Sequence, residues 1–319
     1  MLTTLKWLKI NNFAKKSTVL TYAKKRYSCR TYLISLSACQ LSGPMREGHR
    51  ELRKSQGMDS EGGEGSTLCK DAMANTVDRD WNIFCENGSL SNFGAYGILI
   101  LNRPICISPE NMCQLWSNAC WRITVDGGTN RWFDFVKEHS LSLPLPNYIT
   151  GDFDSIRPEI MDYCKKQDGI NVMKTPDQDY TDFDKGLNVL ITTSPKKLDN
   201  FVVVCENSGR LDQIFSNLNT LYRATLDGFL FSKDSISWML HPGEHKIHIP
   251  PPLCNQNELC GILPLSKPAK VSSKGLKWNL DNHTIEFGGI ISSSNTYDGS
   301  PEVHITTDTT IIWTMSYKQ

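Results

Sequence analysis

The chain has 319 residues, of which 39% are hydrophobic and 21% charged, and its formal net charge at neutral pH is zero. This composition is typical of a folded protein with room for two domains. Zero net charge gives no overall attraction to nucleic acid or to an anionic membrane, and no apolar run approaches the roughly 18 residues of a membrane-spanning helix. We therefore expect neither nucleic acid nor a membrane as a partner.

The N-terminal segment is basic. Residues 1–46 contain nine Lys or Arg and no Asp or Glu. This composition has traits of a mitochondrial transit peptide, but it also fits an extension that a shorter chain, begun at Met45, Met58 or Met73, would lack. We expect a poorly structured extension over residues 1–90 and a cytoplasmic protein, with import through residues 1–46 as the alternative.

The cysteines do not indicate a disulfide framework, and the histidines do not indicate a zinc site. The eleven cysteines are an odd number without a CxxC pair, which favours reduced thiols in an intracellular protein. Three histidines, His241, His245 and His248, lie close together in the sequence. The alternation in "HKIHIP" predicts a strand that sends His245 and His248 to opposite faces, whereas zinc requires converging ligands.

Apolar strands and helices alternate between residues 91 and 233. A helix is indicated where Met112, Leu115, Trp116 and Ala119 recur at helical spacing, and Pro158 is placed to open another. A further helix carries the predicted apolar stripe of Leu211, Ile214, Leu218 and Leu221. The expected strands are "YGILIL" (96–101), "RITV" (122–125), "NYIT" (147–150), "FVVVC" (201–205) and "GFLFS" (228–232). The pattern predicts a Rossmann-like α/β domain, with a mostly parallel sheet flanked by helices.

Helical periodicity ends near residue 234. Short strands separated by Gly, Pro and Asn or Asp turns follow, and they predict an all-β sandwich domain over residues 234–319. The expected strands are "ISWML", "HKIHI", "CGILPL", "AKVSS", "LKWNL", "TIEFGG", "EVHITT" and "TIIWTMS".

Acidic segments come directly after several of these strands. Asp126 follows one strand, Asp152 and Asp154 in "GDFDSI" follow the next, and residues 208–212 follow a third. The segment "TPDQDYTDFDKG" (175–186) is expected to cap a helix near the same place. Because ligands of an open parallel sheet bind at the carboxyl ends of its strands, we expect these segments on one rim.

The chemistry of this rim depends on whether its acids act together. A single DxD after a strand is usually a turn or a helix cap, because Asp accepts backbone hydrogen bonds there. Several carboxylates on one rim repel each other unless a cation compensates, and oxygen ligands suit magnesium carrying a polyphosphate. Neither GxxxxGK[ST] nor GxGxxG occurs, which argues against a P-loop kinase and a dinucleotide dehydrogenase.

The C-terminal half adds an aromatic and a dense set of small polar groups, in "GLKWNL" (275–280) and "ISSSNTYDGS" (291–300). These are open to two interpretations: a core Trp with a polar hairpin loop, or a surface for a flat, cationic heteroaromatic ligand.

The order of "DGGTNR", "GDFDSI", "TPDQDYTDF", "GRLDQ", "GLKWNL", "SSSNTYDGS" and "WTM" resembles the eukaryotic thiamine pyrophosphokinase family, from about residue 96 to the C-terminus. The resemblance implies an α/β ATP-binding domain, a β-sandwich domain and a homodimer with thiamine bound between subunits. It also implies transfer of pyrophosphate from ATP to the thiamine hydroxyl, with release of AMP.

The resemblance further implies roles for individual residues. The implied magnesium ligands are Asp152, Asp154 and Asp182, and these residues with Arg210 form the implied catalytic set. The groups implied around ATP are Asp126, Gln178, Thr181, Arg210 and Asp212. The implied thiamine contacts are stacking on Trp278 and polar contacts from Ser292, Ser294 and Asn295.

One position departs from the family pattern. Glu206 lies where the family has a Gly-rich turn, and it adds bulk and negative charge near the expected phosphates. Either Glu206 points away from the site or nucleotide affinity suffers. The alternatives to an active enzyme are a non-catalytic homologue that binds thiamine or a nucleotide, and a metal-dependent phosphohydrolase using the same acidic rim.

Overall fold

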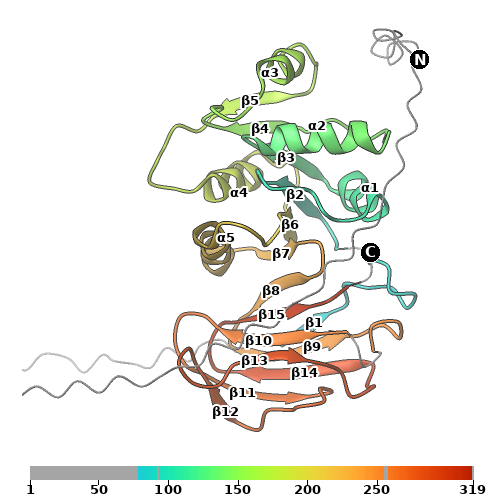
Figure 1. Ribbon diagram of the computed structural model, residues 1–319, viewed down its shortest axis with the longest axis vertical. Coiled ribbons are helices and arrows are strands. Elements are labelled where there is room, and N and C mark those ends of the chain that lie inside the picture. Colours follow the sequence, from blue (N-terminus) through green and yellow to red (C-terminus); the bar gives the residue numbers. More distant parts are fainter. Residues whose placement is uncertain (1–77, 92, 255–257, 318–319) are drawn as a thin grey trace, which may run out of the picture. The chain divides into compact units, whose positions relative to one another are not determined.

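The computed structural model of the protein describes residues 78–91, 93–254 and 258–317. Helices and strands alternate in the first part of the chain, and strands alone follow (Figure 1). Residues 1–46, on which the expectations about location and import depend, lie outside the described residues. None of the described helices has the length and apolar character needed to cross a membrane.

The α/β part is built from parallel strands joined by helices. Its central strand β2 is buried at every residue, as expected for a continuous apolar run with neighbours on both sides. The strands are β2 (Tyr96–Ile100), β3 (Trp121–Val125), β4 (Tyr148–Gly151), β5 (Asn171–Lys174), β6 (Asn200–Val204) and β7 (Asp227–Phe231). The helices are α1 (Pro109–Asn118), α2 (Gly128–Glu138), α3 (Pro158–Cys164), α4 (Asp182–Thr193) and α5 (Leu211–Arg223).

Helix starts in this part follow local sequence signals. Ser108 caps α1 by accepting a hydrogen bond from the backbone N–H of Asn111 at 3.2 Å, and Pro109 occupies the first helical turn. Pro158 likewise opens α3, as the sequence predicts. The helices cover both faces of the sheet: α1 and α2 pack into one core cluster, and α4 and α5 pack into another.

The β-rich part contains a second sheet of five strands in the order β1-β9-β14-β11-β12. Its strands are β1 (Arg79–Trp81), β9 (Gly243–His248), β11 (Ala269–Lys274), β12 (His283–Ile285) and β14 (Glu302–Thr307). The other C-terminal strands are β8 (Ile236–Leu240), β10 (Cys260–Pro264), β13 (Ser292–Asn295) and β15 (Ile311–Met315). The prediction of a β-rich second domain is therefore confirmed.

The prediction of a mostly parallel sheet is wrong, because β8, β15, β10 and β13 join the α/β strands in one mixed sheet. This sheet has ten strands in the order β13-β10-β15-β8-β7-β6-β2-β3-β4-β5. It is parallel from β5 to β7 and antiparallel from β7 to β13. The change of direction comes at a tight turn in which the Ser232 N–H donates to the Ser235 carbonyl at 2.9 Å.

One hydrophobic core connects the two parts. The cluster under α1 and α2 continues through Trp81, Phe229 and Trp238 to the interior of the five-stranded sheet. The expected domain boundary at residues 233–234 thus falls between β7 and β8, which are paired neighbours of one sheet. Residues 79–90, which the sequence assigns to the extension, belong to the fold, since β1 pairs with β9 and Trp81 is buried.

Three local predictions also need correction. Leu211 is 64% exposed, so the apolar stripe of α5 does not include it. The segment "LKWNL" forms a turn between β11 and β12 instead of a strand, and Gly275 enters it with a φ of 86°. The polar segment after it contains β13, which pairs with β10.

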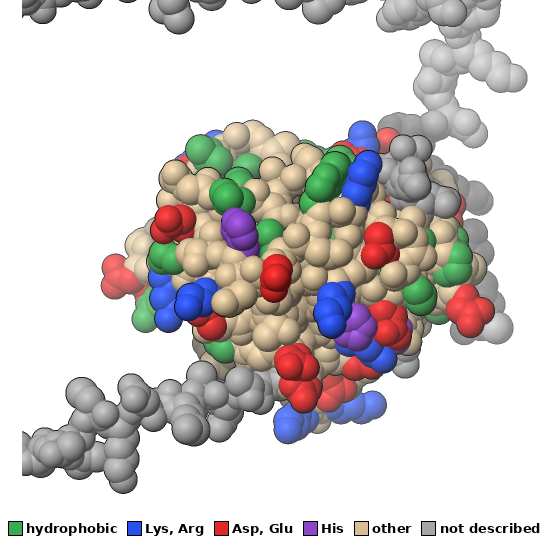
Figure 2. Space-filling view, turned by 90° about the horizontal axis from the view of Figure 1, so that it is seen from below, with side chains coloured by type: hydrophobic (Ala, Val, Ile, Leu, Met, Phe, Trp, Pro, Cys, Tyr) green, Lys and Arg blue, Asp and Glu red, His purple; other side chains and the backbone are tan. Residues whose placement is uncertain are grey.

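The surface at the sandwich end mixes charges of both signs with His side chains, and the hydrophobic side chains on it are scattered (Figure 2). On the five-stranded sheet His248 pairs with Asp80 at 2.6 Å, whereas His245 is buried and accepts from the Trp81 indole N–H at 3.1 Å. The prediction that His245 and His248 point to opposite faces is confirmed, so their ring nitrogens do not converge. The described cysteines are free thiols.

Candidate active site

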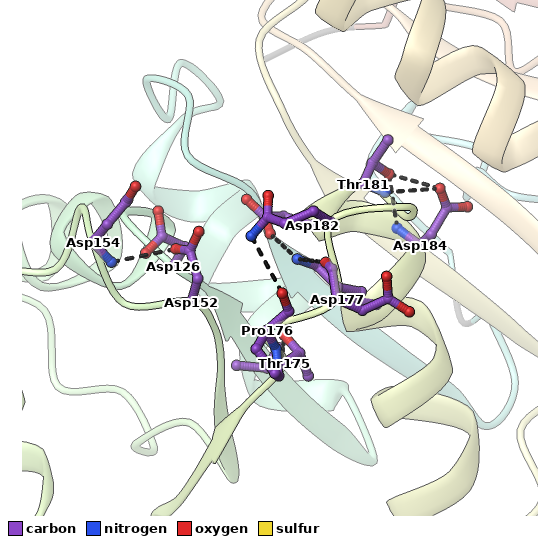
Figure 3. Close-up of polar contacts among 12 residues, drawn as sticks. Asp126, Asp152, Asp154, Thr175, Pro176, Asp177, Thr181, Asp182 and Asp184 are labelled. Atoms are coloured by element: carbon purple, nitrogen blue, oxygen red, sulfur yellow. Dashed lines mark hydrogen bonds and ion pairs between the residues drawn. The ribbon is translucent and has the colours of Figure 1, made fainter.

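Three carboxylates meet at the carboxyl ends of β3 and β4. Asp126 follows β3, and Asp152 and Asp154 follow β4 (Figure 3). Each offers one oxygen, and these oxygens all lie within 4.8 Å of one another. Asp126 is buried, Asp152 is half-buried and Asp154 is exposed. The site is therefore an acidic group open to solvent on one side.

The backbone around Asp126 brings its side chain to this position. Asp126 has a φ of 46°, and its N–H donates to the Thr150 carbonyl at 2.6 Å. Gly151 lies against it with a φ of 140°, and a Cβ there would come within 2.8 Å of the Asp126 Cβ. Burial raises the pKa of the Asp126 carboxyl, while hydrogen bonds from Gly127 and Ser155 act in the opposite direction. A carboxylate in this environment gains from a nearby cation.

Asp152 and Asp154 are held by a tight turn. The Asp154 N–H donates to Asp152 Oδ1 at 3.3 Å, and the Ser155 hydroxyl donates to Asp154 Oδ1 at 2.7 Å. Phe153 between them has a φ of 72°, which a non-glycine residue seldom adopts. The turn directs both carboxylates toward Asp126.

The start of α4 brings a further acid near this group. Thr181 caps the helix in a capping box with Asp184, as the sequence predicts for this segment. Asp182 pairs with Lys185 at 2.9 Å, and Lys185 also donates to the Asp177 carbonyl at 2.9 Å. Asp182 is not one of the three grouped carboxylates, whose third member is Asp126, so the expected set of Asp152, Asp154 and Asp182 is not the set that the structure groups.

A cavity of about 190 Å³ lies beside Asp182, between the ends of β2 and β3 and the helices α4 and α5. Its polar lining includes Asn102, Arg103, Thr181, Asp182, Gln213 and Asn217. The cavity therefore opens at the rim where the strands end, which is the predicted location of a ligand.

Four of the five expected nucleotide-site residues lie outside this cavity lining: Asp126, which belongs to the carboxylate group, and Gln178, Arg210 and Asp212. Gln178 is exposed, and its amide donates to the Pro176 carbonyl at 3.3 Å. Arg210 and Asp212 are exposed and form an ion pair with each other at the start of α5, which holds the pKa of Asp212 below its usual value. The ion pair uses Nε and Nη2 of Arg210, so its remaining N–H groups are left for other acceptors.

Arg103 is a cation of the cavity that the sequence reasoning missed. It is half-buried, and its guanidinium makes no ion pair with a carboxylate of the described residues. A Cβ at Gly209 would come within 2.6 Å of Arg103 Nη2, so Gly209 leaves the room that this side chain occupies. The available signal was its position, since "NRP" directly follows the strand "YGILIL".

Glu206 turns away from the cavity. Its carboxylate accepts a hydrogen bond from the Lys233 backbone N–H at 2.9 Å, and Glu206 is not part of the lining. Burial is the main cause that raises the pKa of the Cys106 thiol, and the negative charge of Glu206 is the second. Of the two alternatives, the structure supports a Glu206 that points outward.

A second group of polar and aromatic residues lies in the β-rich part. Trp278 is 57% exposed, and Lys277 Nζ lies 4.8 Å from the centroid of its ring. Asn295 is buried and hydrogen-bonded to Trp278 and to Ser292, and Ser294 is exposed. Hydrogen bonds thus join three of the four residues expected around thiamine, with Ser294 exposed on the same strand, and Trp278 is not a core residue.

A mixed α/β sheet with a carboxylate cluster and a cavity at its rim, continued by a β-sandwich, defines the class of α/β proteins with a ligand site at the strand ends, here one whose oxygen donors suit a divalent cation. Two family models match the sequence of this chain. One is described as "Thiamin pyrophosphokinase, catalytic domain" and matches residues 112–229, and the other as "Thiamin pyrophosphokinase, vitamin B1 binding domain" and matches residues 244–312. The chain belongs to the thiamin pyrophosphokinase family.

Individual relatives agree with this membership. The chain is 34% identical to thiamine pyrophosphokinase 1 of Oryza sativa subsp. japonica, over 70% of this chain and 88% of the relative. It is 32% identical to thiamine pyrophosphokinase 1 of Arabidopsis thaliana, over 70% and 87%. Among solved structures it is similar to thiamin pyrophosphokinase from Candida albicans, with a TM-score of 0.60 and 26% identity over 70% of this chain and 89% of that one.

Proposed function

We propose that this enzyme transfers the pyrophosphate group of ATP to the hydroxyl of thiamine, giving thiamine diphosphate and AMP, with Mg²⁺ as its cation. The observation that carries the proposal is the group of Asp126, Asp152 and Asp154 beside the rim cavity. Family membership supplies the two substrates, since relatives are named for thiamine and a matched region is described as vitamin B1 binding.

The oxygens of Asp126, Asp152 and Asp154 fit a hard divalent cation such as Mg²⁺. A cation there neutralises phosphate charge as it develops during transfer. Asp182 stays in our proposed catalytic set as a neighbour of this group, oriented by Lys185. In-line attack by the thiamine hydroxyl requires the two substrates to be held in position more than it requires covalent chemistry.

We assign the nucleotide to the rim cavity. Thr181 and Asp182 lie in its wall at the start of α4, and Arg103 supplies a positive charge. We retain Gln178, Arg210 and Asp212 as groups around the nucleotide and its phosphates, at the edge of the cavity.

We assign thiamine to the exposed ring of Trp278, with Ser292 and Ser294 as polar contacts. No residue of the β-rich part is among those that line the rim cavity. This separation supports a homodimer in which the Trp278 of one copy faces the acidic group of the other.

The deciding experiment incubates the purified full chain with ATP, MgCl₂ and thiamine and measures AMP and thiamine diphosphate. We expect both products in equal amounts. Thiamine binding without AMP would identify a non-catalytic homologue, and ATP hydrolysis that ignores thiamine would identify a phosphohydrolase. Sedimentation of the same sample measures whether the active species is a dimer.

Arg103→Gln removes the cavity's cation while keeping a side chain of similar length. We expect the KM for ATP to rise about 10-fold or more, the effect of losing a hydrogen bond from a charged donor. Arg210→Gln, at an exposed arginine already paired with Asp212, serves as the comparison and should have the smaller effect. The reverse order in steady-state kinetics would move the phosphate-binding role from Arg103 to Arg210.

Glu206→Gln removes the negative charge that distinguishes this loop and keeps an oxygen for the Lys233 N–H. Because the carboxylate points away from the cavity, we expect the KM for ATP to stay within about twofold of wild type. A tenfold fall in that KM would show that Glu206 repels the phosphates.

A further inference from the structure

The turn that carries Trp278 is fixed from both sides by its neighbours. Trp278 exposes more than half of its surface, so burial of the ring does not hold it. Its backbone is held instead: the Lys277 N–H donates to the Thr296 carbonyl at 2.8 Å, and both polar backbone groups of Trp278 bond to one side chain, that of Asn295.

The Asn295 carboxamide makes four hydrogen bonds and is only 2% exposed. Its Oδ1 accepts from the Trp278 N–H at 3.3 Å and from the Thr296 N–H at 2.9 Å. Its Nδ2 donates to the Trp278 carbonyl at 2.9 Å and to the Ser292 hydroxyl oxygen at 3.1 Å.

These bonds use the whole capacity of the side chain. An amide oxygen has two lone pairs and an amide nitrogen has two protons, and all four are engaged within the protein. The orientation of the amide is also determined, because rotating it would place its NH₂ group against two N–H donors. Asn295 therefore has no donor or acceptor left for a ligand.

Ser292 is oriented by the same contact. Its oxygen accepts from Asn295, which leaves its own proton for another acceptor. One buried amide thus holds both the backbone of the aromatic residue and the oxygen of the neighbouring hydroxyl.

We propose that Asn295 is a positioning residue, which fixes Trp278 and Ser292 for thiamine and makes no contact with thiamine itself. This inference rests on the proposed function, because it takes Trp278 as the thiamine platform. It replaces the direct polar contact of Asn295 that the family resemblance implies.

The test is a double-mutant cycle on thiamine affinity with Asn295→Ala, Trp278→Ala and the double variant. We expect Trp278→Ala to raise the KM for thiamine about 10- to 100-fold, the range that loss of a stacked aromatic gives. Asn295→Ala should raise it by a similar or smaller factor, with kcat and the KM for ATP near wild type. The double variant should lose clearly less than the two single losses combined, since both changes remove the Trp278 platform and only the effect on Ser292 adds to it.

Asn295→Asp distinguishes a positioning role of Asn295 from direct contact with thiamine. It also replaces Asn295→Ala in the test if that variant fails to fold. It keeps an oxygen for both N–H donors but sets a carboxylate oxygen against the Trp278 carbonyl, so positioning predicts weaker thiamine binding. Thiamine carries a positive charge, so a carboxylate that touched it would instead bind it more tightly. Tighter binding by Asn295→Asp, or additive losses in the cycle, would overturn the proposal.

Asn147→Ala is the matched control for a general loss of stability. Asn147 Oδ1 accepts from the Arg122 N–H at 2.9 Å just before β4, at the end of that strand away from the acidic group. We expect a lower melting temperature and an unchanged KM for thiamine. If the wild-type chain forms no thiamine diphosphate, the proposed function fails by itself, and the same cycle on the thiamine Kd from calorimetry still decides the role of Asn295.

Discussion

Asp152→Asn is expected to lower kcat for thiamine diphosphate formation by about 10²- to 10³-fold, comparable with removing one group that stabilises charge in a transition state. Asn keeps the size of the side chain and one neutral oxygen, but it removes a charge from a group whose oxygens lie within 4.8 Å of one another. The Mg²⁺ concentration for half-maximal activity should rise as well. Thiamine affinity, which depends on Trp278, should be retained.

Asp168→Asn provides the control for this substitution. Asp168 is exposed to solvent and lies between α3 and β5, away from the carboxyl ends of the strands, so the variant should match wild type in kcat and in Mg²⁺ dependence. Equal loss in the two variants would mean that the assay reports net charge. Wild-type activity of Asp152→Asn would remove Asp152 from the metal site and leave the proposed grouping without support.

The parts of the fold that the sequence predicts are those with local signals. Continuous apolar runs indicate β2, β3, β6 and β7, Pro158 indicates where α3 begins, and the segment 175–186 indicates the cap of α4. The position of the acids followed from one rule, that the carboxyl ends of parallel strands share an edge. For these elements, spacing along the chain is enough to infer neighbours in space.

The corrections concern interactions between residues far apart in sequence. Nothing local in β8 shows that it pairs with β7 and extends the same sheet, since strand pairing is decided by the packing of the whole core. Leu211 matches the helical period of α5, yet it lies on the first turn, beyond the covered part of the sheet.

The site shows the same limit at the level of side chains. The sequence identified Asp126, Asp152 and Asp182 as acids of one rim, but it does not show that Asp126 joins Asp152 in a carboxylate group while Asp182 pairs with Lys185 in the cavity wall. Likewise, motif matching suggests Asn295 as a thiamine contact, whereas its hydrogen bonds assign it to the backbone of Trp278.

The second large effect is expected from Gly151→Ala, which adds one carbon next to the acidic group. The φ of 140° at Gly151 is unfavourable for a residue with a side chain, and the new Cβ would lie 2.8 Å from the Asp126 Cβ. Because Asp126 is buried between its neighbours, the clash must displace its carboxylate. We expect the free energy of unfolding to fall by about 1–3 kcal/mol and kcat to fall about 100-fold, as displacements near 1 Å do in active sites.

Gly169→Ala distinguishes the clash from the backbone strain. Gly169 also has a positive φ, 92°, but a Cβ there would meet nothing within 4 Å. This variant should therefore lose stability in a denaturant titration but keep wild-type kcat and Mg²⁺ dependence, since the acidic group is untouched. If Gly151→Ala lost only stability, the position of Asp126 would be irrelevant to turnover. If Gly151→Ala lost both stability and kcat, and Mg²⁺ no longer raised its melting temperature, the added Cβ would have acted by disturbing the proposed cation site.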